Sequence, residues 1–142
     1  MSYQIAAIPV TLVEVLWDRL LPHIQRVVDI APDELTVEKI KERSLTADIV
    51  LTTISKGSNI IGVITLEIRT FDTGIRALYL PVIGGNEMFD WMDQYLDVAH
   101  AIAKDFNCQQ IRGLAARKGW MRVLKDKGFE EVYTAVKCEV RS

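Results

Sequence analysis

The segment 48–83 is the part of the sequence that most restricts the fold, because its pattern changes from helical spacing to runs of strand-forming residues. Three runs rich in Ile, Val, Leu and Thr are separated by the turn-forming stretches KGSN (56–59) and FDTG (71–74). Two such runs joined by a short glycine-containing turn are typical of a hairpin. The runs are 48–55, 60–68 and 75–83. The segment therefore predicts a three-stranded antiparallel meander in the middle of the chain.

Helical patterns flank this meander on both sides. A short strand is predicted at 3–9. Thr11 and Glu14 have the spacing of a capping box at a helix start, and Pro22 is expected to kink or end that helix. The remaining predictions are a short helix at 36–43, a long amphipathic helix at 89–106, a strand at 109–116, a helix at 119–129 that ends at Gly128, and a strand at 130–140. The predicted order is β-α-α-β-β-β-α-β-α-β.

Length and composition narrow the classes of protein that this chain can belong to. The 142 residues suit a single domain over 1–142. A net charge of −2 does not favour a nucleic-acid-binding protein, and the apolar runs are shorter than the ~18 residues that a membrane span needs. The two cysteines, Cys108 and Cys138, are expected to be free and buried. Neither has a neighbouring histidine for a metal site, and nothing in the sequence indicates an oxidising compartment for a disulfide. No metal is predicted, and a cytoplasmic location is the default expectation.

The order of elements and two local motifs resemble the GNAT family of N-acetyltransferases. The sharper motif is VLKDKGFEEVYTAVKCEV, in which a short helix closes in Lys-Gly-Phe and a strand follows. The second motif, RKGWMRVLK, together with the upstream Gly-Gly and the WM pair, is similar to short GNAT-like proteins of tailed bacteriophages. The resemblance implies an α+β fold, in which a mixed, mostly antiparallel twisted sheet carries helices on both faces.

The resemblance also implies where coenzyme A would bind. In GNAT enzymes the loop between the fourth strand and the long helix holds the pyrophosphate, because its backbone amides and the helix N-terminus favour an anion. In this chain the two loop glycines are adjacent rather than spaced, no Arg or Gln precedes them, and Glu87 would repel a phosphate. A plain tight turn followed by an Asn86 helix cap is the alternative. The residues implied to contact coenzyme A are Leu80, Val82, Gly84, Gly85, Asn86 and Arg117.

Catalytic candidates come from the third and fourth predicted strands, where the active-site residues of the GNAT family tend to lie. Glu67 is a candidate base and Tyr79 a second candidate, whose side chain should face away from those of Leu78 and Leu80. A structural role on the polar side of a strand remains the alternative for both. The tyrosine that commonly acts as the acid in this family is replaced by Leu124, which cannot donate a proton.

Two functions therefore remain open. In the first, the chain is a cofactor-free GNAT-shaped protein, phage-encoded and acting as a binding or virion component in the host cytoplasm or the particle. In the second, it is an acetyl-CoA-dependent N-acetyltransferase that acts on an unidentified primary amine. A protein partner or self-association would use exposed aromatic side chains, for which Trp17, Trp91 and Trp120 are the candidates. The alternative is that all three are core or groove-lining residues. Neither a nucleic-acid nor a membrane partner is expected.

Overall fold

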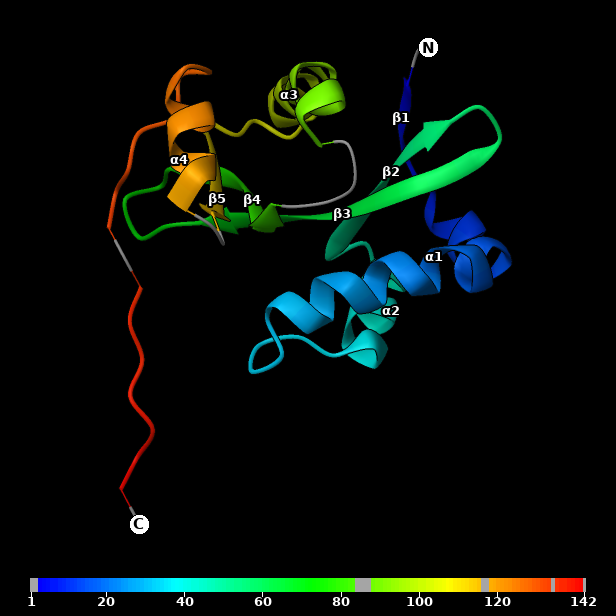
Figure 1. The fold of residues 1–142 in the computed structure, drawn as a ribbon, viewed down its shortest axis with the longest axis horizontal. Coiled ribbons are helices and arrows are strands. Elements are labelled where there is room, and N and C mark those ends of the chain that lie inside the picture. The colour runs from blue at the N-terminus through cyan, green and yellow to red at the C-terminus, as the bar shows by residue number, and fades with distance from the viewer. Residues whose placement is uncertain (1–2, 84–87, 116–117, 134, 142) are drawn as a thin grey trace.

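The computed structural model describes residues 3–83, 88–115, 118–133 and 135–141. Figure 1 shows a sheet between two groups of helices. The elements in chain order are β1 (Tyr3–Ala7), α1 (Val10–Ile30), α2 (Val37–Leu45), β2 (Ile49–Lys56), β3 (Asn59–Thr70), β4 (Arg76–Ile83), α3 (Met88–Asp105), β5 (Gln110–Ala115) and α4 (Lys118–Lys125). The predicted order is confirmed from the first strand to the last helix.

Within the described residues, five strands form one sheet in the order β1-β2-β3-β4-β5. Neighbouring strands are antiparallel except for β4 and β5, which are parallel. The predicted meander is therefore confirmed as β2, β3 and β4. Gly57 lies in the turn between β2 and β3 with a φ of 62°, a conformation that glycine adopts without a steric cost.

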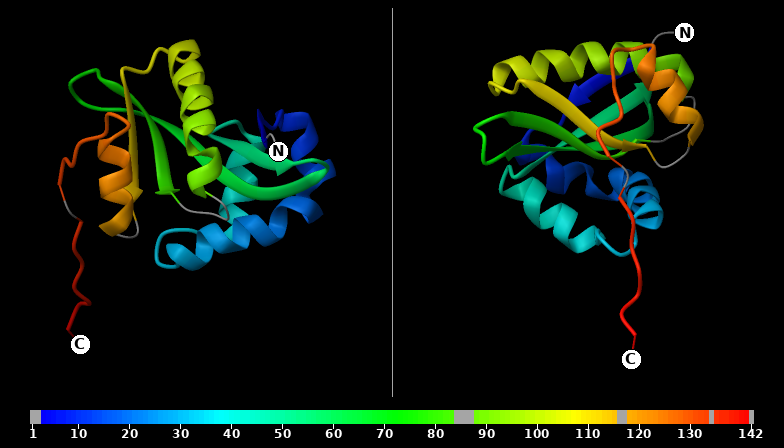
Figure 2. Two further views of the ribbon diagram at one scale, coloured as in Figure 1. Left: turned by 45° about the horizontal axis from the view of Figure 1, so that its top comes forward. Right: turned by 90° about the vertical axis from the view of Figure 1, so that its left-hand side faces the viewer.

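The helices cover both faces of the sheet (Figures 1 and 2). Helices α1 and α2 pack on one face and α3 and α4 on the other, and each pair closes its own hydrophobic core. Val63 and Ile64 of β3 belong to different cores, because successive side chains of a strand point to opposite faces. The first core includes Trp17, Leu20, Ile24, Ile40, Leu51 and Val63, and the second includes Ile64, Leu78, Leu80, Trp91, Tyr95 and Leu124.

Helix α1 differs from its prediction at both ends. It begins at Val10 with Pro9 in the capping position and has no side-chain cap, so the predicted capping box at Thr11 is wrong. Pro22 does not end the helix, which continues to Ile30. An interior proline costs about 3 kcal/mol or more. Leu20 and Ile24 flank it and are completely buried, and their burial stabilises the helix on both sides of the proline.

Helix α2 begins as its sequence predicts. The Thr36 hydroxyl accepts a hydrogen bond from the Lys39 amide at 3.2 Å, which makes Thr36 the N-cap. Ile40 lies in the core against the sheet. The Thr36 cap fixes the point where the loop 31–36 ends and α2 begins. This loop lies at the rim of the cavity described below.

The strand predicted at 130–140 is wrong: the described residues of this segment form no strand. Gly128 does have the expected left-handed conformation, with a φ of 90°. Beyond it the chain leaves the edge of β5 and runs away from the sheet (Figures 1 and 2). The alternating side chains are mostly exposed, from 61% for Val132 to 96% for Val140. Alternation of apolar and polar residues thus predicts which side chains would share a face of a strand. It does not predict whether a neighbouring strand is present to pair with that segment.

One ion pair holds this C-terminal segment near the loop that precedes α2. The Lys137 ammonium donates to an Asp33 carboxylate oxygen at 2.6 Å. That hydrogen bond, together with the charge of Lys137, lowers the pKa of Asp33. Because both side chains are largely exposed, we expect the pair to contribute little to stability.

His23, in α1, makes the stability of the fold depend on pH. Burial, and secondarily the charge of Arg26, lowers its pKa from 6.5, and its Nδ1 atom has no hydrogen-bond partner in the described part of the chain. Below about pH 6.5 the unfolded chain therefore binds more protons than the folded one, so the free energy of unfolding falls as pH falls. We expect urea unfolding between pH 7 and 5 to show this loss, and His23→Gln to reduce it. An unchanged slope in the variant would contradict the assignment to His23.

Candidate active site

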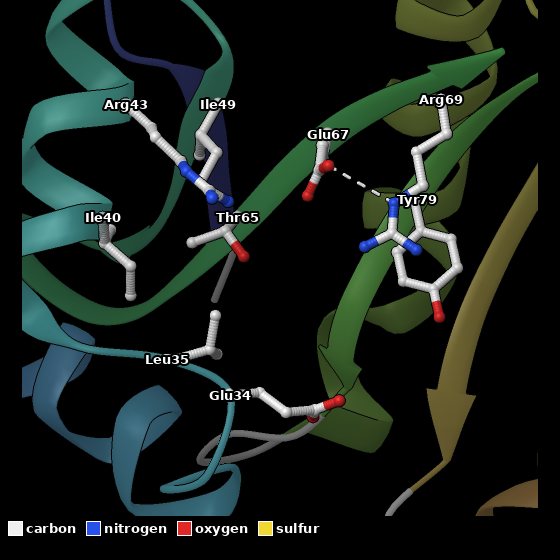
Figure 3. Close-up of a pocket in the computed structure, with 9 residues that line it drawn as sticks. All are labelled: Glu34, Leu35, Ile40, Arg43, Ile49, Thr65, Glu67, Arg69 and Tyr79. Carbon is white, nitrogen blue, oxygen red and sulfur yellow. Dashed lines mark hydrogen bonds and ion pairs between the residues drawn. The ribbon is translucent and has the colours of Figure 1, made fainter. Parts of the chain in front are cut away.

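A cavity of about 160 Å³ lies on the α2 side of the sheet. Figure 3 shows the side chains that reach it from the loop before α2, from α2 itself, and from three neighbouring strands. The lining residues are Glu34 and Leu35 of the loop, Ile40 and Arg43 of α2, Ile49 of β2, Thr65, Glu67 and Arg69 of β3, and Tyr79 of β4. Both catalytic candidates from the sequence therefore lie in the same cavity.

Strand alternation explains why these side chains converge. Glu67 and Arg69 are two residues apart on β3 and share a face, while Leu66 between Thr65 and Glu67 is buried in the opposite core. Glu67 pairs with Tyr79 across the β3–β4 ladder, so the two side chains stand next to each other. Tyr79 faces the cavity and its neighbours Leu78 and Leu80 face the other core, as the alternation predicts.

Arg69 connects the two candidate catalytic residues. Its Nε donates to Oε1 of Glu67 at 3.3 Å, and its guanidinium carbon lies 3.8 Å from the centroid of the Tyr79 ring. A guanidinium over an aromatic face is held by a cation–π interaction. The Glu67 side chain is 28% exposed, so its carboxylate is oriented by Arg69 and still open to a ligand. Such a carboxylate can accept a proton.

The ladder between β4 and β5 is irregular where the resemblance places the thioester. Pairing is regular from Ala77 to Leu80 and then shifts, so that Ile83 pairs with Ala115. Pro81, within the shift, has no backbone amide to donate. Uniform pairing of the two strands along their whole length would exclude a slot for pantetheine. The register shift means that β4 and β5 are not paired in this uniform way.

The residues that the resemblance assigns to coenzyme A are only partly described. Leu80 and Val82 lie on β4 at the irregular pairing. The Leu80 side chain is buried in the α3 core, so only its backbone can contact a ligand. Gly84, Gly85, Asn86 and Arg117 lie outside the described residues.

Leu124 stands where the GNAT family commonly has a tyrosine that acts as the acid. Its side chain packs in the core beside α3 and is 3% exposed. Tyr95 does not provide a substitute acid, because its hydroxyl is buried 3.0 Å from the Thr52 hydroxyl, and burial raises its pKa far above the usual range. Tyr79 lines the cavity and is the better-placed tyrosine.

Other expectations can be compared with the described part of the chain. Trp17 and Trp91 are buried, so the proposal that they form an exposed partner surface is wrong, while the Trp120 side chain lies outside the description. Both cysteines are free, but Cys108 is only partly buried and Cys138 is exposed. The described residues contain no cluster of three or more candidate metal ligands, and none of their helices is long and apolar enough to cross a membrane.

The sequence patterns missed three of the cavity's charged residues: Glu34, Arg43 and Arg69. Arg69 could have been found, because its position two residues after Glu67 on an alternating strand places both side chains on one face. Glu34 and Arg43 carry no such local signal, since a loop carboxylate and a helix arginine are usually solvated.

No protein-family model and no curated protein matches this chain, but solved structures of acetyltransferases do. One is a ribosomal-protein-alanine N-acetyltransferase from Brucella melitensis, with a TM-score of 0.71, 13% identity, and coverage of 99% of this chain and 100% of that one. A predicted acetyltransferase with acetyl-CoA from Clostridium acetobutylicum has a TM-score of 0.66 and 15% identity, with 97% and 96% covered. An aminoglycoside acetyltransferase from an uncultured soil sample, in complex with sisomicin, has a TM-score of 0.68 and 9% identity, with 98% and 97% covered. Identities this low show the shared fold alone.

Proposed function

We propose that this chain, which has a GNAT fold, is an N-acyltransferase that moves an acyl group from an acyl-CoA to an amine. The observation that carries the proposal is the position of the cavity. Glu67 and Tyr79 line it together, and Tyr79 lies one residue before Leu80, after which the pairing of β4 with β5 shifts. An amine in the cavity would thus lie beside the slot that the resemblance assigns to the thioester.

The residues of the cavity supply the proton transfers that such a reaction needs. Acyl-CoA, when bound, supplies the thioester whose carbonyl carbon the amine attacks and whose carbon–sulfur bond breaks. Glu67 accepts the proton that the amine nitrogen loses, directly or through one water. Arg69 holds the carboxylate toward the cavity. The Tyr79 hydroxyl, or water, protonates the leaving thiolate.

The described residues fit a bound acyl-CoA at one end. The shift between Leu80 and Ile83 interrupts the regular β4–β5 ladder, and backbone groups at such an irregularity can pair with a ligand rather than with a strand. Leu80 and Val82 would contribute these backbone contacts to pantetheine. The proposed pyrophosphate contacts of Gly84, Gly85 and Asn86, and the proposed contact of Arg117, rest on the family resemblance.

Calorimetric titration with acetyl-CoA tests this proposal. We expect binding heat, and at a ligand concentration a hundredfold above Kd we expect a stabilisation of about 2.7 kcal/mol in thermal unfolding. The matched control ligand is 3′,5′-ADP, which lacks the pantetheine arm and should bind more weakly. The absence of both binding heat and a thermal shift at millimolar acetyl-CoA would contradict the proposal.

The exposed C-terminal segment favours a second candidate function, as a binding protein. Val132, Tyr133, Val136 and Val140 present apolar surface along one extended stretch, and such surface is common where another protein docks. Light scattering of the purified chain, run beside the titration, tests this candidate: a defined oligomer without acetyl-CoA binding would favour it. Neither the fold nor the structural neighbours support a phage origin or a virion role.

A further inference from the structure

We infer that the acceptor is a small primary amine that also carries an anionic group, either a carboxylate or a phosphate. This inference rests on the proposed function and identifies the substrate class of the same cavity. It starts from the four charged side chains that line the cavity: Glu34, Arg43, Glu67 and Arg69. Their formal charges cancel, but only Glu67 and Arg69 are paired with each other.

Arg43 is the cation available for a ligand. It enters the cavity from α2, and in the described part of the chain its guanidinium makes no hydrogen bond or ion pair. Two carboxylates close to it in sequence already have partners: Glu42 pairs with Lys39, and Asp48 accepts from the Thr46 hydroxyl. Arg43 is held at the end of α2, where its carbonyl accepts from the Asp48 amide at 3.0 Å.

Glu34 is the corresponding anion. It lies in the loop before α2, where its amide and that of Leu35 both donate to the Ala31 carbonyl at 3.1 Å. The neighbouring Asp33 is paired with Lys137, whereas the Glu34 carboxylate has no partner among the described residues. Figure 3 shows that the Glu34 and Arg43 side chains enter the cavity from different elements. The cavity thus offers one unpaired charge of each sign to a ligand.

A ligand with both charges matches this arrangement. A guanidinium binds a carboxylate or a phosphate through two parallel hydrogen bonds, so Arg43 would hold the anionic group. Glu34 and Glu67 would attract the ammonium group, which must lose one proton before its nitrogen attacks the thioester. The apolar side chains of Ile40 and Ile49 are buried beneath the cavity and would contact a short aliphatic stretch between the two charged ends.

The size of the cavity limits the acceptor. Its volume of about 160 Å³ is below the roughly 300–1,000 Å³ of sites that enclose drug-sized ligands. An aminoglycoside or another large amine would not fit inside it. We therefore expect a compact acceptor with its amine and its anionic group at opposite ends.

Three probes and three variants test the inference. The probes are 4-aminobutyrate, 2-aminoethyl phosphate and n-butylamine, which has the amine but no anion. Binding is measured by calorimetry without acetyl-CoA, and transfer is measured as thiol release with it.

We expect Arg43→Gln to weaken binding of the tighter anionic probe by about ten- to a hundredfold, because a hydrogen bond to a charged group is lost. The same variant should leave the binding of n-butylamine unchanged. Arg43→Lys should restore part of the binding, and Lys39→Gln, the same charge change elsewhere on α2, should have no effect.

The outcomes separate the inference from the proposed function. If n-butylamine binds as well as both anionic probes, or if Arg43→Gln weakens none of them, the inference is overturned. If thiol is released with n-butylamine at a rate independent of Arg43, the acyltransferase proposal stands and the inference fails. If an anionic probe binds through Arg43 but no amine releases thiol, the binding site stands and the proposed function fails. The better of the two anionic probes identifies the carboxylate or the phosphate as the recognised group.

Discussion

Replacing Glu67 with Gln is expected to lower the rate of acyl transfer by about 10²–10⁴-fold, the usual contribution of a general base. Glutamine has nearly the same shape and can still accept the hydrogen bond that Arg69 donates to Glu67 at 3.3 Å, but it cannot take a proton from the amine. The loss should therefore appear in kcat. Steady-state thiol release at saturating acetyl-CoA measures it, and calorimetry should show unchanged acetyl-CoA binding.

The matched control is Glu42→Gln, which removes a carboxylate that is paired with Lys39 on the exposed side of α2. This variant should keep its full rate. A Glu67→Gln variant with an unchanged kcat would show that water alone takes the proton and that Glu67 has only a structural role. A loss in the variant that is confined to KM would instead indicate a role in binding the amine.

Replacing Trp91 with Ala is expected to destabilise the fold by about 3–5 kcal/mol, as is typical for a large aromatic side chain removed from a core. Trp91 is 1% exposed, and its ring meets that of Tyr95 edge-on at 5.9 Å. The variant would lose both this contact and the part of the packing of α3 on the sheet that the Trp91 side chain supplies. Because whole domains are stable by only about 5–15 kcal/mol, urea unfolding should show a large fall in the midpoint.

Val136→Ala is the control for this prediction. Val136 is 91% exposed in the segment that was expected to be a strand, so its truncation should change the free energy of unfolding by less than about 0.5 kcal/mol. Equal losses in the two variants would contradict the structure, because they would mean that the C-terminal segment is buried as deeply as α3.

The positions of the catalytic candidates on the sheet follow from local patterns. Alternation along 60–68 and 75–83 places Glu67 and Tyr79 away from the buried leucines beside them. The proximity of the two side chains also depends on the register of β3 with β4, in which Glu67 lies opposite Tyr79. That register depends on the geometry of the turn at 71–75, which the residue types alone do not specify.

Three secondary-structure predictions differ from the structure: the start of α1, the effect of Pro22 and the strand at 130–140. Thr11 and Glu14 have capping-box spacing, but the helix starts two residues earlier than such a box would place it, with Pro9 in the capping position. A proline usually ends a helix, but here the burial of Leu20 and Ile24 outweighs the cost of Pro22. The segment 130–140 does alternate, but an alternating pattern contains no information on whether another strand is available to pair with it.

The sequence by itself determined the order of the elements from the first strand to the last helix, the meander and the face of the sheet on which Glu67 lies, because hydrophobic periodicity is a local property. Only the tertiary structure decided that Glu67, Arg69 and Tyr79 form one cluster and that Arg43 and Glu34 share their cavity. These groups come from two strands, a helix and a loop, and the packing of α2 on the sheet brings them together. A charge without an intramolecular partner can be recognised only when all of its neighbours in space are known.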